Sequence, residues 1–219
     1  MKPLGILGGT FDPVHCAHLR LAEEAAEALA LERVRWIPSG NPGHRAAPQT
    51  PGRHRLEMVR LAIVGNPRFE VDAAEAESAT PGFTLDTLGR LRAEIGSSRP
   101  LVFLIGADQL LALHTWKRWR DLFDLAHFAV GARPGYSLAT EALAPEVAAE
   151  VRQREAGADG LAAAPAGRIA TFAMTPLAIS ASDIRGRLAS GRSVRYLLPR
   201  EVLAYIEANT LYGEERSSS

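Results

Sequence analysis

The chain has 219 residues, of which 47% are hydrophobic and 23% are charged, a balance typical of a soluble globular domain with a substantial core. Its 25 basic and 25 acidic residues cancel, which argues against a global electrostatic attraction to nucleic acid or to membranes. An anionic ligand would therefore have to be held by charge that is gathered locally. No apolar stretch approaches the roughly 18 residues of a membrane span.

The single cysteine and the N-terminus indicate the compartment. Cys16 cannot form an internal disulfide, which fits a reducing environment. Only Lys2 carries a charge before the first apolar run, and this is not the pattern of a secretory signal. We therefore expect a cytoplasmic protein.

Short apolar runs alternate with helical patterns along the chain. The apolar runs cover residues 4–7, 34–37, 69–71, 101–105, 128–130 and 169–173. The helical patterns cover residues 18–31, 53–64, 84–95, a broken stretch at 107–125, 141–155, 182–189 and 200–208. Because the runs lack polar alternation and each is followed by a helix, they predict the buried strands of a mostly parallel sheet.

Right-handed crossovers turn such a sheet into a doubly wound α/β fold, and we expect a single domain over residues 1–212. The tail 213–219 is polar and is expected to be disordered, and the Ala/Gly-rich stretch 156–167 is expected to form a surface loop. Sheets of this kind bind ligands beyond the carboxyl ends of their strands. The functional loops should therefore be residues 8–17, 38–52, 72–83, 106–119, 131–136 and 174–182.

The strongest candidate for a ligand site follows the first apolar run. Gly8, Gly9 and Thr10 end this run, and a helical pattern follows. Glycines let a phosphate approach the backbone, and the free N–H groups of a helix's first turn point at an anion. Taken alone, a glycine pair is as often only a tight turn, and the pattern matches neither the dinucleotide nor the P-loop fingerprint. Asp12 would cap the helix, with Pro13 in its first turn.

Two histidines, His15 and His18, stand at the start of this helix. Because they are three residues apart, they should share one helix face and reach one ligand together. The competing interpretation is a zinc site formed by both histidines and Cys16. Zinc sites usually need three or four ligands, no second cysteine or histidine cluster occurs in the sequence, and Cys16 would point away from the shared face. We therefore favour phosphate chemistry, with no metal bound by side chains.

The sequence around these histidines resembles a known family. The segment Gly8-Gly-Thr-Phe-Asp-Pro-Val-His15-Cys-Ala-His18 is similar to the N-terminal motif of the nucleotidyltransferase superfamily with the T/H-x-G-H signature, and within it to the bacterial nicotinate-mononucleotide adenylyltransferases. Further segments match in the family's order, at residues 37–45, 83–88, 103–110, 115–116, 133–136 and 179–185. The match runs from residue 4 to about residue 212, and the combination is highly specific.

The resemblance implies a Rossmann-like nucleotidyltransferase fold and adenylyl transfer from ATP to nicotinate mononucleotide. The products would be nicotinate adenine dinucleotide and pyrophosphate, in a step of NAD biosynthesis. His15 and His18 would be the catalytic residues and would donate hydrogen bonds to the phosphates. The nucleophile is already an anion, so no general base is needed. Mg²⁺ is expected to be carried on the ATP phosphates.

The resemblance also assigns two groups of binding residues. The ATP and phosphate group comprises Gly8, Gly9, Thr10, Phe11, Gly106, Asp108, Ser180, Ser182 and Arg185. The pyridine-nucleotide group comprises Asn41, His44, Arg45, Phe83, Thr84, Trp116 and Arg133. Plainer interpretations exist as well. Ser180 or Ser182 could simply cap a helix, as could Asp108, and Trp116 and Trp119 could both be core residues.

Two positions depart from the family pattern, because Ala17 replaces the glycine of the H-x-G-H signature and Ala181 replaces a hydroxyl residue. Two rival functions stay open: an enzyme with another acceptor, nicotinamide mononucleotide or phosphopantetheine, and a nucleotide sensor without catalysis. Trp116 and the segment 83–84 favour a flat aromatic acceptor, and the retention of both histidines and Arg185 argues against the sensor. Nucleic acid and membranes are not expected partners, and the sequence leaves a homo-oligomer open.

Overall fold

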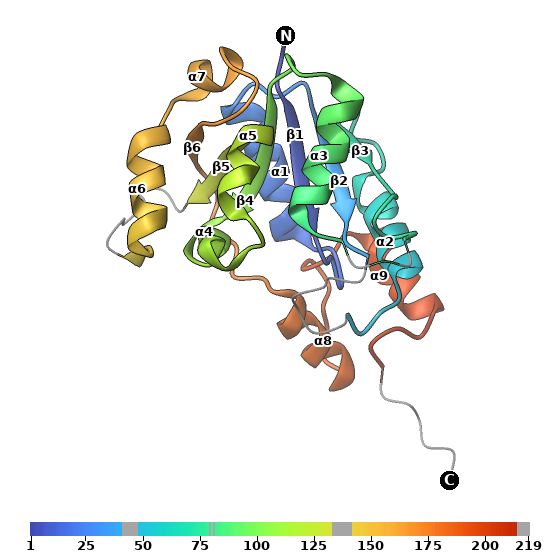
Figure 1. The fold of residues 1–219 in the computed structure, drawn as a ribbon. Coiled ribbons are helices and arrows are strands. Elements are labelled where there is room, and N and C mark those ends of the chain that lie inside the picture. The colour runs from blue at the N-terminus through green and yellow to red at the C-terminus, as the bar shows by residue number, and fades with distance from the viewer. Residues whose placement is uncertain (41–47, 79, 81, 133–141, 214–219) are drawn as a thin grey trace.

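The structure, a computed structural model, describes residues 1–40, 48–78, 80, 82–132 and 142–213. Its centre is a six-stranded sheet in which every neighbouring pair of strands is parallel, in the order β3-β2-β1-β4-β5-β6 (Figure 1). The strands are β1 (Leu4–Gly9), β2 (Arg33–Pro38), β3 (Phe69–Val71), β4 (Leu101–Gly106), β5 (His127–Ala132) and β6 (Ile169–Ala173). The predicted doubly wound, parallel α/β fold is confirmed.

β1 is the strand at which the order of the sheet reverses. Leu4 is in register with Arg33 of β2 on one side and with Leu101 of β4 on the other. The chain up to β3 extends the sheet in one direction, and β4 to β6 extend it in the other. At such a reversal the connections after the two central strands diverge, which leaves a crevice at the carboxyl edge of the sheet.

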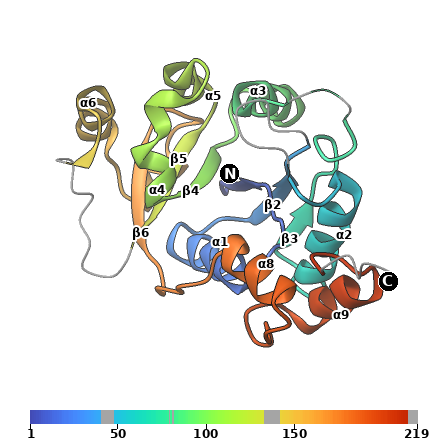
Figure 2. The same cartoon turned by 90° about the horizontal axis from the view of Figure 1, so that it is seen from below.

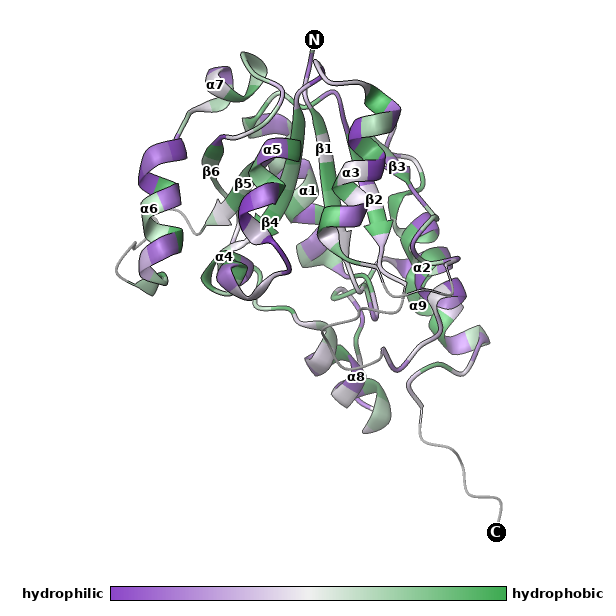
Figure 3. Ribbon diagram, viewed as in Figure 1, coloured by the Kyte–Doolittle hydropathy of each residue, from purple (hydrophilic) through white to green (hydrophobic). Residues whose placement is uncertain are grey.

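Helices cover both faces of the sheet because buried strand residues alternate between the faces. In β4, Val102 and Leu104 pack in the core cluster that also holds residues of α1, α2 and α9, whereas Phe103 and Ile105 pack in the cluster with α3, α5 and α6. Figure 2 shows α1 and α9 on one side of the sheet and α3, α5 and α6 on the other. In Figure 3 the central strands are mostly hydrophobic, while α3 and α6 carry both colours.

The helices have the following bounds: α1 Cys16–Ala28, α2 Gly52–Ile63, α3 Thr84–Ile95, α4 Ala107–Leu111, α5 Leu122–Leu125, α6 Pro145–Arg154, α7 Ala158–Ala162, α8 Ala181–Ala189 and α9 Arg200–Ala208. Two 3-10 turns, η1 (Leu113–Thr115) and η2 (Trp119–Asp121), interrupt the region between α4 and α5, so the stretch 107–125 is broken as expected. Within the described part of the chain, no helix is both long and apolar enough to cross a membrane.

Two expectations about local structure are wrong. The first strand does not end at Leu7, since Gly8 and Gly9 continue β1 in register with Ile37 and Pro38, which also excludes the alternative of a tight turn there. Strand pairing uses only backbone groups, and these residues therefore extend the ladder without side chains. The stretch 156–167 is not only a surface loop, because α7 forms there and buries Leu161 completely. Its alanines are strong helix formers, which explains the difference.

Two predicted helix starts are also displaced. The first helix begins at Cys16 rather than His18. The helix expected over 141–155 begins at Pro145, whose missing N–H and fixed φ suit a first helical turn. Glu141 and the tail 214–219 lie outside the described residues.

Candidate active site

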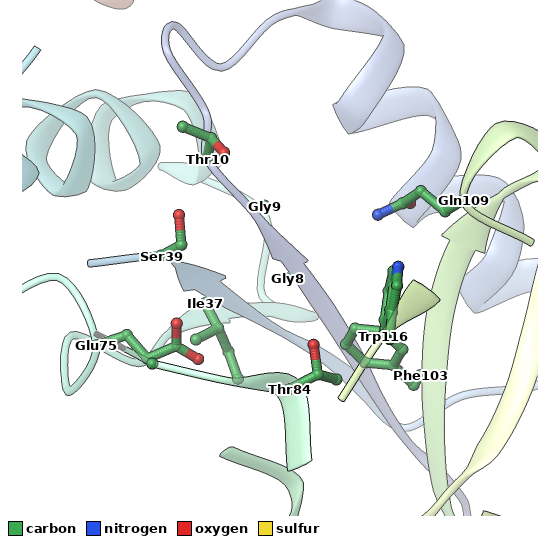
Figure 4. Close-up of a pocket in the computed structure, with 11 residues that line it drawn as sticks. Gly8, Gly9, Thr10, Ile37, Ser39, Glu75, Thr84, Phe103, Gln109 and Trp116 are labelled. Atoms are coloured by element: carbon green, nitrogen blue, oxygen red, sulfur yellow. The ribbon is translucent and has the colours of Figure 1, made fainter. Parts of the chain in front are cut away.

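A pocket opens at the carboxyl edge of the sheet, where the strand order reverses (Figure 4). It holds about 550 Å³ of empty space, part of which is open to solvent. Its lining residues come from β1, β2 and β4 and from the segments that follow β1, β2, β3 and β4: Gly8, Gly9, Thr10, Ile37, Ser39, Glu75, Gly82, Thr84, Phe103, Gln109 and Trp116. The pocket therefore joins the glycine motif of β1 to Thr84 and Trp116, which the sequence assigns to a different ligand.

The end of β1 presents bare backbone to this pocket. A Cβ on Gly9 would lie 2.9 Å from the ring of Phe11, so only glycine lets the chain fold back so closely. The Phe11 ring is 2% exposed and packs against Trp36, with 5.5 Å between ring centroids. The side chain of Phe11 is thus part of the core that supports the strand end, and it does not line the pocket.

His15 and His18 are brought together, although not by sharing a helix face as predicted. His15 precedes α1 as its N-cap residue, in extended conformation, and His18 lies in the first turn. The two rings stack with 3.7 Å between centroids, and the edge of His18 meets Phe11 at 5.0 Å. The pair is held by the bend at the helix start.

A hydrogen bond fixes which nitrogen of His18 can donate. The backbone N–H of His15 donates to His18 Nδ1 across 3.2 Å, so Nδ1 is the acceptor. A neutral ring then carries its proton on Nε2. His15 Nδ1 is buried and has no hydrogen-bond partner among the described residues. Nε2 is therefore the nitrogen of His18 that can donate to a ligand.

Both histidines are neutral at pH 7 in this structure. Burial lowers the pKa of His15 to about 4. Burial also lowers the pKa of His18 well below its usual range, and repulsion between the two rings when both are protonated lowers it further. The pair can thus offer neutral N–H donors to a phosphate without carrying a fixed positive charge into the site.

Asp12 connects the histidine loop to three distant parts of the chain, and it does not cap α1 as predicted. Its side chain is buried and accepts hydrogen bonds from the Tyr212 hydroxyl at 2.6 Å and from the Gln49 N–H at 2.9 Å. Its backbone carbonyl accepts one from Arg185 Nη1 at 2.6 Å. Burial, and then the bond to the Asp12 carboxylate, raise the pKa of Tyr212, so that the hydroxyl stays a donor. The cap position belongs to His15 because the helix begins three residues later than the Asp-Pro pair suggested.

The start of α8 carries the predicted hydroxyl and guanidinium groups. Ser180 Oγ accepts the Asp183 N–H at 3.1 Å, which confirms that this serine is a helix N-cap. Arg185 Nη2 donates to Ser182 Oγ at 3.3 Å while Nη1 holds the Asp12 carbonyl. Ala181 is the first residue of the helix, where a hydroxyl is not needed for capping. Arg185 therefore ties α8 to the loop after β1.

The far wall of the pocket is aromatic. Trp116 is half-buried, lines the pocket and meets Phe103 edge to face, with ring centroids 6.1 Å apart and an interplanar angle of 78°. Trp119, by contrast, is only 8% exposed and packs in the core. Phe83 is the N-cap of α3, and Lys117 Nζ lies 4.1 Å from its ring centroid. Of the two tryptophans, one is thus free to stack on a ligand and the other is structural.

Gly106 and Asp108 lie at the carboxyl end of β4. The Gly106 N–H donates to Gln109 Oε1 at 3.1 Å, so Gln109 rather than Asp108 satisfies the start of α4. The Asp108 carboxylate is left exposed at the strand end. The interpretation of Asp108 as a helix cap is therefore wrong.

Four predicted site residues, Asn41, His44, Arg45 and Arg133, lie outside the described residues. Among the residues that are described, no three His, Cys, Asp or Glu side chains gather in a group able to hold a metal ion. Cys16 Sγ faces the Tyr196 carbonyl at 3.8 Å.

Sequence reasoning missed Arg55, Glu75 and Tyr212. The burial of Arg55 could have been predicted, because Arg55 stands three and four residues before Met58 and Val59 and so shares the buried face of α2 with them. A charge on such a face calls for a specific partner. Glu75 and Tyr212 carried no signal, since their contacts are made only in the folded chain.

The comparisons with known proteins agree with this geometry. A model of the cytidylyltransferase-like family matches residues 6–187. The chain belongs to the cytidylyltransferase-like family. A relative from Dechloromonas aromatica is 54% identical over 212 residues, covering 96% of this chain and 98% of the relative. A relative from Chromobacterium violaceum is 48% identical over 210 residues, covering 95% and 98%. Both are named probable nicotinate-nucleotide adenylyltransferase, and the chain belongs to that branch of the family.

A solved structure shares the fold at much lower identity. It is the Plasmodium falciparum nicotinic acid mononucleotide adenylyltransferase complexed with NaAD, with a TM-score of 0.71 and 16% sequence identity, covering 97% of this chain and 98% of that chain. The chain therefore shares this fold over nearly its whole length.

The lowered pKa of His15 predicts an acid-sensitive stability. With a pKa of about 4 in the folded chain and 6.5 as the ordinary value, the unfolded state binds the proton more tightly, so stability falls as the pH drops from about 6.5 towards 4. Between pH 7 and pH 5 this group should remove about 2 kcal/mol from the free energy of unfolding. Urea unfolding at both pH values should show a smaller loss in His15→Gln than in the wild type. An equal loss in the two proteins would contradict the shift.

Proposed function

We propose that this chain transfers the adenylyl group of ATP to the phosphate of nicotinate mononucleotide, releasing pyrophosphate and nicotinate adenine dinucleotide. The observation that carries the proposal is the hydrogen bond from Arg185 to the Asp12 carbonyl. This bond brings the start of α8 to the histidine loop, close to the pocket that Trp116 lines. The names of the two relatives, which match nearly the whole chain, support the same activity.

The chemistry needs positioning and charge stabilisation rather than a base. A phosphate oxygen of the mononucleotide attacks the α-phosphorus of ATP, a new P–O bond forms, and the bond to the β-phosphate oxygen breaks with its electron pair leaving on pyrophosphate. The attacking oxygen is already ionised, so no proton has to be removed. Neutral histidine donors suit this reaction. His15 and His18 would donate to the α-phosphate oxygens as charge builds up, together with the backbone of Gly8, Gly9 and Thr10.

The remaining ATP groups are assigned to α8 and to the end of β4. Free N–H groups at the start of α8, with Ser182 and Arg185, would hold the β- and γ-phosphates, and Ser180 would keep that turn in place. Asp108 would bind a ribose hydroxyl, with Gly106 beside it. Mg²⁺ would enter with ATP as part of the substrate, because this ion commonly keeps its waters and binds phosphate oxygens.

The acceptor would occupy the aromatic side of the pocket. Trp116 would stack on the pyridine ring, and the start of α3, at Phe83 and Thr84, would donate to the nicotinate carboxylate. Arg45 and Arg133, with Asn41 and His44, are proposed from the family resemblance to contact the mononucleotide phosphate.

The composition supports small-molecule partners in the cytoplasm. Equal numbers of basic and acidic residues argue against nucleic acid or a membrane surface as a partner, and the single thiol of Cys16 fits a reducing compartment.

An acceptor panel tests the function. Pyrophosphate release from ATP should be fastest with nicotinate mononucleotide, slower with nicotinamide mononucleotide, and absent with phosphopantetheine. Fastest release with either of the other acceptors would assign the chain to a different transferase. Binding of ATP without release in any of the three reactions would favour the nucleotide sensor.

Replacing His18 tests its role on the phosphates. His18→Ala should lower kcat by about 10²-fold, the usual cost of one donor that acts on the transition state. Cys16→Ser, a substitution two residues away on a side chain that faces a carbonyl, should leave kcat nearly unchanged. Near-normal turnover in His18→Ala would remove this histidine from the mechanism, and a large loss in Cys16→Ser would favour a metal or thiol role.

Replacing Trp116 tests the stacking surface. Trp116→Ala should raise KM for nicotinate mononucleotide by about threefold to tenfold, in line with roughly 0.5–1.5 kcal/mol for an aromatic pair, while KM for ATP changes little. Trp116→Phe keeps a ring and should recover most of the loss. Equal increases in both KM values would show that the indole supports the whole site instead of one ligand.

A further inference from the structure

One cation is fully buried beneath the pocket. Arg55 is 1% exposed, and it is the only buried lysine or arginine in the described part of the chain. Its guanidinium makes three hydrogen bonds, all to backbone carbonyls: Nε donates to Thr50 at 3.0 Å, Nη1 to Thr10 at 2.6 Å and Nη2 to Gly40 at 2.8 Å. No ion pair joins it to a carboxylate among the described residues.

Burying this charge is costly. Burial lowers the pKa of Arg55, and the nearby charge of Asp12 opposes that effect only in part. Neutral carbonyls satisfy the N–H groups but leave the charge without a paired anion. Replacing a buried charged group with well-packed hydrophobic residues usually makes a protein more stable. A guanidinium at this point is therefore better explained by what it holds than by stability.

Two of the carbonyls that accept hydrogen bonds from Arg55, those of Thr10 and Gly40, belong to segments that line the pocket or adjoin its lining residues. Thr10 follows the glycine pair of β1 and lines the pocket, and Gly40 follows Ser39, which lines it from the end of β2. A Cβ on Gly40 would collide with the backbone oxygen of Glu75. The segment after β3 therefore packs directly against Gly40, whose carbonyl accepts from Arg55. One guanidinium thus fixes the spacing of the strand ends on one side of the pocket.

Glu75 extends this arrangement into the pocket wall. Its carboxylate lines the pocket and accepts a hydrogen bond from Thr87 in the first turn of α3. Thr84, which begins α3, lines the pocket beside it. Displacing the carbonyl of Gly40 would therefore shift the acceptor side of the pocket as well as the glycine motif.

We propose that Arg55 is a positioning residue for the reaction: its guanidinium clamps the loops after β1 and β2 at the separation that the phosphates require, and its buried charge adds positive potential behind the backbone that receives them. The part that concerns catalysis rests on the proposed function. The part that concerns the loops does not.

Arg92 provides a matched control at the opposite edge of the sheet. Its guanidinium also bonds only to backbone carbonyls, at Leu125, Gly96, Arg99 and Pro165, with distances from 2.6 to 3.1 Å. These residues precede β4, β5 and β6, so they lie at the amino ends of the strands, away from the pocket. Arg92 is half-buried rather than fully buried, and burial lowers its pKa as it does that of Arg55, so the two side chains share their bonding pattern but not their full burial.

The experiment compares Arg55→Lys with Arg92→Lys in the full chain. Lysine keeps the charge, but its three N–H groups sit on one nitrogen and cannot span the three separate carbonyls. Both variants should lose stability to urea. Only Arg55→Lys should lose at least about tenfold in kcat/KM for both substrates, as expected when reacting groups are misplaced, while Arg92→Lys stays within about twofold of the wild type.

Hydrogen exchange followed by mass spectrometry reads the loops without requiring catalysis. Arg55→Lys should speed exchange in peptides covering residues 8–12 and 38–40, and Arg92→Lys should leave them at the wild-type rate. Unchanged exchange there, or equal kinetic losses in the two variants, would overturn the proposal. If the wild type transferred no adenylyl group, the proposed function would fail, and the exchange data would still decide whether Arg55 clamps the loops.

Discussion

The buried carboxylate and carbonyl of Asp12 are the contacts on which the site depends. They receive hydrogen bonds from Tyr212, Gln49 and Arg185, which reach the loop after β1 from three separate parts of the chain. Without them the start of α8 would have no polar connection to the histidine loop among the described contacts. A buried carboxylate must be satisfied by donors, so its desolvation cost makes this arrangement specific.

Two kinds of side chain surround the loop after β1. His15 and His18 are neutral because burial lowers their pKa values, whereas the guanidinium groups of Arg185 and Arg55 donate to the Asp12 and Thr10 carbonyls of the same loop. In the proposed reaction, the neutral histidines would donate hydrogen bonds to a phosphate, and the two arginines would add positive potential near it. This division fits a chain with no net charge, where the field at the site must be local.

Particular residues show how far the sequence leads. The six strands could be predicted because uninterrupted apolar runs indicate a sheet that is buried on both faces. The pairing of His15 with His18 was predicted from helical spacing, but the rings meet because His15 caps the helix. The family resemblance assigned Trp116 to the ligand, whereas residue spacing alone left both Trp116 and Trp119 as core candidates. The structure buries Trp119 in η2 and leaves Trp116 on the pocket.

The sequence by itself determined the parallel α/β fold, the family and the glycine–histidine motif, because these depend on local patterns that survive without knowledge of long-range contacts. Only the tertiary structure decided which polar groups meet. Arg55 donates hydrogen bonds to Thr10 and Gly40, and Tyr212 donates one to Asp12. These partners are too far apart in the sequence for helix or strand periodicity to predict their contact. These contacts arise because parallel strands bring their carboxyl ends to one edge, where residues far apart in the chain share one buried environment.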